Sequence, residues 1–138
     1  MARIGDISSP VAGSLYGHLY AALKAAGLPV NGTSDFPRVE IVSVLEEQPQ
    51  DKAGNLRSVN VTIDAMSAAS QGEAVRLGEQ AIAAIMDAET NVPGIASAFT
   101  FDIVGAFETS VEMKEDYIET QLQSYRLTHV IQFIINRE

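Results

Sequence analysis

The chain has 138 residues, the size of one domain, and its hydrophobic content of 46% excludes an intrinsically disordered protein. Its apolar runs are all short of the roughly 20 residues that cross a bilayer, and its N-terminus lacks the build of a secretory signal. Nine Lys and Arg against 18 Asp and Glu give a formal net charge of −9, which argues against tight nucleic-acid binding. The absence of cysteine excludes disulfides and thiolate metal sites.

The first 30 residues predict a short arm and a helix. Residues 1–8 form the expected N-terminal arm. Ser9 is a good N-cap and Pro10 suits the first helical position. Gly27 and Pro29 are expected to end the helix. Apolar residues recur between these points at spacings of three and four, as in a helix with one buried face: Ala12, Leu15, Tyr16, Leu19, Leu23 and Ala26.

Two strands are expected next. The first covers residues 39–45, where apolar residues on both faces indicate cover on both sides. A polar connection over residues 46–55 follows it. Over residues 58–65 apolar and polar residues alternate strictly, which predicts a half-buried antiparallel strand.

A second helix is predicted over residues 71–88. Ser70 and Glu73 have the spacing of a capping box, in which each side chain accepts a hydrogen bond from the other residue's backbone amide. Gly78 would let the helix lie close to a sheet. The apolar face is predicted to consist of Val75, Gly78, Ile82, Ile85 and Met86.

The last third of the chain predicts two strands joined by a loop. The first strand is marked by Phe99, Phe101, Ile103 and Phe107, with a bulge at Gly105. Residues 108–120 are polar and acidic, and we expect them to form a loop. The longest strand signal covers residues 122–136.

The predicted order is α-β-β-α-β-β in a single α+β domain over residues 1–138. A mostly antiparallel four-stranded sheet with two helices packed on one face would bury all of these apolar stripes together.

Few residues offer catalytic chemistry. His18 and His129 are the two histidines, and each lies within an apolar pattern that favours a packing or interface role. The acidic pairs Glu46–Glu47 and Glu115–Asp116 lie in polar segments that offer little cover to shift a pKa. No nucleophile motif or phosphate-binding glycine loop is present. We therefore expect no enzyme, no cofactor and no metal site.

The 108–120 segment has the composition of a partner-contact loop. Its acids are expected to face a partner or the lumen of an assembly: Glu112, Glu115, Asp116 and Glu119. Its apolar residues would serve as anchors on that partner: Val111, Met113, Tyr117 and Ile118. The alternative is a plain loop folded back on its own domain.

The final strand carries apolar residues on both faces. Its odd-numbered residues from Tyr125 to Ile135 are apolar except for His129. On the other face Val130 and Ile134 accompany polar residues such as Arg126. Because two helices cover only one face of a sheet, we expect a second subunit to cover Val130, Ile134 and Arg126.

The whole-chain layout resembles the tail terminator, or tail completion, proteins of long-tailed bacteriophages. The matching features, over about residues 10–137, are a helix containing Leu15-Tyr16-Gly17-His18-Leu19-Tyr20, the strand entry Pro37-Arg38-Val39-Glu40-Ile41, and a closing hairpin from Phe107 to Phe133. The 108–120 segment is longer and more acidic than the common pattern of that family.

This resemblance implies a structural virion protein, assembled in the host cytoplasm. Such proteins form a ring, commonly of six copies, that caps the tail tube and meets the head-side connector. DNA passes through the ring without specific binding, and no membrane is involved. The alternatives are another neck, head-completion or tail component, or a small cytoplasmic protein that binds a ligand near Tyr16, Tyr20 and His129.

Overall fold

The computed structural model describes residues 6–7, 10–30, 36–46, 56–88 and 102–136. The elements, in chain order, are β1 (Asp6–Ile7), α1 (Pro10–Ala25), β2 (Arg38–Glu46), β3 (Leu56–Ser67), α2 (Gln71–Ala88), β4 (Asp102–Ile118) and β5 (Gln121–Asn136).

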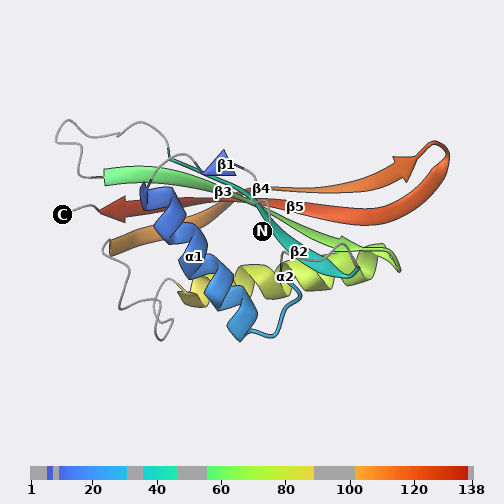
Figure 1. Ribbon diagram of the computed structural model, residues 1–138, viewed down its shortest axis with the longest axis horizontal. Helices are drawn as coiled ribbons and strands as arrows, with labels where there is room; N and C mark the ends of the chain where they lie inside the picture. Colours follow the sequence, from blue (N-terminus) through green and yellow to red (C-terminus); the bar gives the residue numbers. More distant parts are fainter. Residues whose placement is uncertain (1–5, 8–9, 31–35, 47–55, 89–101, 137–138) are drawn as a thin grey trace.

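The strands form one sheet in the order β1-β2-β3-β5-β4, with both helices on the same face (Figure 1). The pairs β2–β3, β3–β5 and β4–β5 are antiparallel. The predicted α+β fold and its α-β-β-α-β-β order are therefore confirmed. The two-residue strand β1 lies within the expected N-terminal arm and adds a short parallel fifth strand beside β2.

Helix α1 packs its predicted stripe against the sheet. Leu15, Leu19 and Leu23 are fully buried. Gly27 has a φ of 80°, a left-handed conformation that favours glycine. The backbone amides of Gly27 and Leu28 then bond the carbonyls of Lys24 and Leu23 at 3.0 and 3.2 Å, which closes the helix. The predicted N-cap, Ser9, lies outside the described residues.

Helix α2 begins and ends where the sequence predicts, but its cap differs. The Glu73 amide donates to the Ser70 hydroxyl at 3.0 Å, as in a capping box. The Glu73 carboxylate instead accepts from the hydroxyl of Ser67, the last residue of β3. That hydroxyl also accepts from the Ser70 amide at 3.3 Å, so Ser67 connects the strand end to the helix start.

The buried face of α2 is rotated from the predicted one. Gly78 and Ile85 are buried as expected, but Val75 is exposed and Ile82 is only half-buried. Their places are taken by Ala74, Leu77 and Ala81. The predicted Met86 contact lies outside the residues whose side chains are described. Small alanines suit this face because α2 lies close to the sheet.

The core lies between the helices and one face of β2, β3 and β5. Residues pointing to this face are fully or almost fully buried, and alternate along each strand as a two-residue period requires: Val39, Ile41, Val59, Val61, Ile63, Ile131 and Phe133. A register shift between Ile41 and Ser43 brings Val44 to the buried side of β2. The mixed pattern of apolar residues in this strand therefore reflects a bulge. The expected cover on both sides is not found among the described residues, since Leu45 is exposed on the side away from the helices.

The expected loop at 108–120 is wrong. Strand β4 continues to Ile118, and Glu119, with a φ of 58°, and Thr120 turn the chain directly into β5. The predicted bulge at Gly105 is confirmed by a register shift between Ile103 and Gly105. Further shifts at Glu108/Ser110 and Asp116/Tyr117 bend the pair along its length. The acidic segment is therefore one side of a long β-hairpin.

Candidate interaction surfaces

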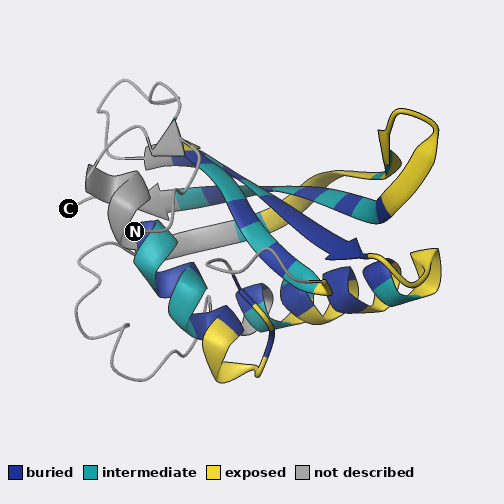
Figure 2. Cartoon of the chain, turned by 45° about the vertical axis from the view of Figure 1, so that its right-hand side comes forward, coloured by how far each residue is buried: buried dark blue, intermediate teal, exposed yellow. Residues whose placement is uncertain are grey.

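The end of the β4–β5 hairpin extends past the rest of the sheet. The pairing of β3 with β5 ends at Ser67 and Tyr125, so residues 116–118 and 121–124, beyond the Glu115–Tyr125 pair, pair only with each other. We call residues 115–124 the hairpin arm. It curves away from α2 at one end of the molecule and is mostly exposed (Figures 1 and 2).

Apolar side chains gather on the hairpin arm. Ile118 at its turn is 66% exposed and Tyr117 is 54% exposed, and Leu122 across the turn is also exposed. Of the other predicted anchors, Val111 is exposed and Met113 half-buried; both lie nearer the body, opposite His129 and Leu127 of β5. The four predicted anchors therefore lie along one strand instead of in one loop.

Arg126 fastens the base of the hairpin arm to the body of the sheet. Its Nη2 lies 3.0 Å from Oδ1 of Asp116 on β4, and its Nη1 lies 3.5 Å from Oδ2 of Asp64 on β3. Ser124 donates to Asp116 at 3.2 Å, and Thr128 donates to the buried Asp64 at 2.6 Å. This Arg126 bridge joins three strands, and it gives Arg126 a role within the subunit besides any contact with a partner.

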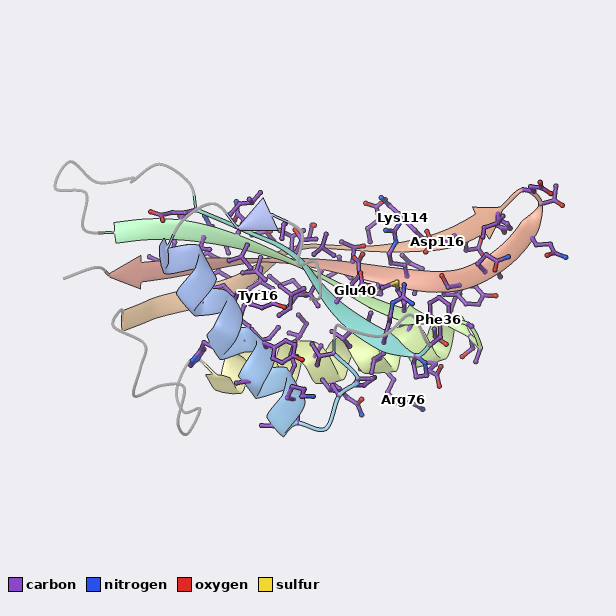
Figure 3. The ribbon with its side chains drawn as sticks, viewed as in Figure 1. Tyr16, Phe36, Glu40, Arg76, Lys114 and Asp116 are labelled. Atoms are coloured by element: carbon purple, nitrogen blue, oxygen red, sulfur yellow. The ribbon has the colours of Figure 1, made fainter. Side chains whose placement is uncertain are left out.

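The four predicted acids of the 108–120 segment make different contacts. Asp116 belongs to the Arg126 bridge, and Glu112 lies 3.8 Å from Nζ of Lys114, an exposed pair (Figure 3). Glu115 accepts a hydrogen bond from the Tyr117 hydroxyl at 3.3 Å. Its negative charge is the main reason that the pKa of Tyr117 lies above its usual value of 10.0. Glu119 occupies the turn, where it is exposed.

His129 is a packing residue beneath α2. It is buried, and its Nδ1 contacts the Glu108 carboxylate of β4. Its Nε2 faces Gly78: a Cβ placed on that glycine would lie 2.5 Å away. The prediction that Gly78 permits a close approach is supported by this contact. Glu108 was expected in a loop, and the bulge after it explains how it reaches the helix side of the sheet.

The sheet face opposite the helices bears the residues for which we expected a second layer. Val130 and Ile134 lie on this open face and are half-buried, whereas their neighbours Ile131 and Phe133 on the other face are fully buried. Val130 pairs with Thr62, and Ile134 with Ser58. Leu45 of β2 and Phe107 of β4 are also exposed. Leu45 pairs with a residue of β3, and Phe107 pairs with a residue of β5. The open face is thus polar with separate apolar residues.

The described part of the chain does not bring together the groups that a metal ion or the alternative small ligand would contact. Within it, no three His, Asp or Glu side chains form a group fit for a metal ion. None of its helices is long and apolar enough to cross a membrane. Tyr16 and Tyr20 stack on each other, with ring centroids 6.0 Å apart. A hollow of about 460 Å³ beside the end of α1 is lined by neither tyrosine nor His129, but by Ala26, Gly27, Leu28, Gln80, Ala83 and Ala84.

Sequence reasoning missed Asp64, Ser124 and the hollow. Asp64 and Ser124 stand in alternating strands as ordinary outward-facing polar residues. Only the register of β3, β5 and β4 shows that they converge on Arg126. The hollow depends on how the turn after α1 meets α2, and no local pattern encodes that packing.

No protein-family model and no curated protein matches this sequence. Solved structures do match. One of them is a chain from the "Virion of native gene transfer agent (GTA) particle", with a TM-score of 0.65 and 19% sequence identity; the match covers 94% of this chain and 99% of that one. The chain therefore shares its whole fold with a component of that particle.

Proposed function

We propose that this protein is a structural subunit of a phage-like virion, and that it is a tail terminator. In this role it forms a ring, with six copies expected, that caps the tail tube and joins it to the head-side connector. The ring needs no cofactor, and DNA passes through it without specific binding.

The observation that carries the proposal is the whole-chain match to a virion component. The match covers nearly all of both chains, so the shared fold is not a fragment of a larger domain. The sequence resemblance to tail terminators rests on the same span, from α1 to the closing hairpin. At 19% identity the likeness is one of fold, and the terminator role is our inference from both resemblances.

The surfaces of the subunit support assembly. The hairpin arm exposes Tyr117, Ile118 and Leu122, and the open sheet face leaves Val130 and Ile134 half-covered. Exposed apolar groups gathered at one site are typical of protein contacts. The net charge of −9 is compatible with a lumen that lets DNA slide past, since like charges repel.

Particles produced without this protein test the role directly. A terminator stops tube growth, so we expect its loss to give tails of variable, excessive length without heads, seen by electron microscopy. Tails of normal length without heads would point to another neck component. Normal tails joined to heads would contradict both roles.

A further inference from the structure

We propose that the hairpin arm of one subunit inserts its tip into the hollow between α1 and α2 of the next copy. This inference rests on the proposed ring, and it names two surfaces, in addition to the open sheet face, that would hold neighbouring copies together.

The arm tip exposes a knob, a group of apolar side chains that the described residues of its own chain do not cover. Ile118 is its most exposed large apolar residue, and Tyr117 and Leu122 flank it. The tip is also held in a fixed direction, because the Arg126 bridge ties Asp116 at its base to Asp64 in the sheet. A fixed knob loses less conformational entropy on binding than a flexible loop would.

The hollow has the size and lining to receive this knob. Its volume of about 460 Å³ exceeds that of one large aliphatic side chain, and five of its six lining residues are Ala, Gly or Leu. Ala83 and Gln80 are exposed, so the hollow is open to solvent. Small lining residues let a neighbouring backbone approach closely.

Charges of opposite sign lie near the two surfaces. Glu115 and Glu119 lie beside the knob, and both are exposed. On the helix layer, exposed Lys24 lies in the last turn of α1, two residues before Ala26. Exposed Arg76 lies one turn before Gln80 on α2 and points away from the sheet (Figure 3). Arg76 also lies 3.9 Å from Glu73 of its own helix, and the exposed acid Glu79 precedes Gln80. In the proposed contact, Lys24 and Arg76 would face the acids of the arm.

The two surfaces are different parts of the subunit, as a head-to-tail contact requires. The arm leaves one end of the sheet, while the end of α1 lies in the helix layer, away from the arm (Figure 1). A contact between two different surfaces on one subunit is head-to-tail, and such contacts close into rings when the rotation permits. A two-fold dimer would instead bury the same surface on both copies.

The absence of native cysteine makes a disulfide test possible. Ile118→Cys and Ala83→Cys would be prepared as separate proteins, mixed in equal amounts, oxidised and examined on a non-reducing gel. We expect a mixed disulfide between two copies, at least about tenfold more abundant than with the control pair Ile118→Cys and Val75→Cys. Val75 is an exposed residue of the same helix that does not line the hollow.

Light scattering gives the particle mass of the same samples. It distinguishes a failure of the arm contact from a failure of the proposed ring. A closed oligomer with the mixed disulfide supports both. A closed oligomer with no more cross-link than the control overturns the arm contact and leaves the ring. Cross-linked chains that grow without closing support the contact and contradict the ring. Monomers without cross-link at every concentration count against both.

Two variants without a change of charge provide a second test of the contact between the arm and the hollow. Ile118→Ser removes the knob and Ala83→Trp fills the hollow, and both positions are exposed, so we expect folded proteins with unchanged melting. Each should weaken assembly by about tenfold or more, because apolar area is no longer buried between copies. Assembly at wild-type concentrations in both variants would overturn the proposal.

Discussion

Gly78 shows how a single residue sets the distance between a helix and the sheet. A Cβ at this position would lie 2.5 Å from Nε2 of His129 and 3.0 Å from Cδ2 of Leu127. Both neighbours are buried, and His129 also contacts Glu108, so the imidazole has little room to move. The close approach of α2 thus depends on this one missing side chain.

Gly78→Ala should therefore lower stability in spite of the better helix propensity of alanine. Overpacking of a tight core costs about 1–3 kcal/mol, which exceeds the gain of about 1 kcal/mol expected from replacing glycine in a helix. Urea unfolding followed by circular dichroism measures the difference. Gly72→Ala is the matched control, because Ser70 Oγ at 3.9 Å is its nearest neighbour; this variant should be neutral or stabilising. Equal stability of the two variants would contradict the account.

Tyr117 should titrate above its usual pKa of 10.0, mainly because of the neighbouring charge of Glu115. A pKa raised in the folded state stabilises the protein below the unfolded value, and this contribution is lost as the pH rises through the folded value. Absorbance near 295 nm follows the phenolates of all four tyrosines together, so the Tyr117 titration is read as the difference between the protein and its Tyr117→Phe variant. Glu115→Gln should bring the Tyr117 pKa down toward 10.0, and Glu112→Gln, which changes an acid paired with Lys114, should change it less. An identical titration in wild type and Glu115→Gln would refute the assignment.

At the scale of the elements, the hairpin arm is the feature that most needs explanation. Long two-stranded extensions are marginal in water unless other contacts support them. Here the Arg126 bridge supplies them, by joining β4 to β5 and to the buried Asp64 of β3.

Replacing Arg126 should loosen the arm and lower stability. Arg126→Met leaves the buried Asp64 with its Thr128 bond but without a cation, which costs about 1–3 kcal/mol since the site is partly open to solvent. Hydrogen exchange should become faster in residues 115–124. Lys114→Met is the control: its pair with Glu112 is exposed at both ends and is worth about 0–1 kcal/mol. Unchanged exchange in the arm of Arg126→Met would show that the bridge does not hold it.

The sequence predicts the elements well where one local signal dominates. Ser70 and Glu73 locate the start of α2, and Gly27 locates the end of α1. The face of α2 was misjudged because Val75 and Ile82 are more hydrophobic than Ala74 and Ala81, whereas the close packing at Gly78 selects small residues.

The same limits explain the error in β4. Acidic residues and lysine are unfavourable in strands, so residues 108–120 have the composition of a loop. The alternation of Val111 and Met113 with Glu112 and Lys114 was the available strand signal. The hydrogen bonds to β5 and the Arg126 bridge, both contacts between distant residues, outweigh the local preference.

At the scale of the whole molecule, the open sheet face offers a test of assembly. Val130 and Ile134 are half-buried there, so an aspartate at either position should still reach solvent in a single subunit. Val130→Asp and Ile134→Asp should break assembly and leave a folded monomer, measured by light scattering and thermal melting. Val75→Ser, at an exposed helix position that lies neither on the open sheet face nor in the lining of the hollow, should still assemble. If both sheet variants unfold, these residues belong to the monomer core instead.

The central claim, that the protein works as a closed ring, is tested most directly by its mass in solution. Light scattering would be measured over a wide range of concentrations, with the chain alone and with assembled tail tubes. The account predicts a closed oligomer whose mass stops growing near six copies of the 14.8 kDa chain. A monomer under every condition, tubes included, or an oligomer that grows without limit would contradict it.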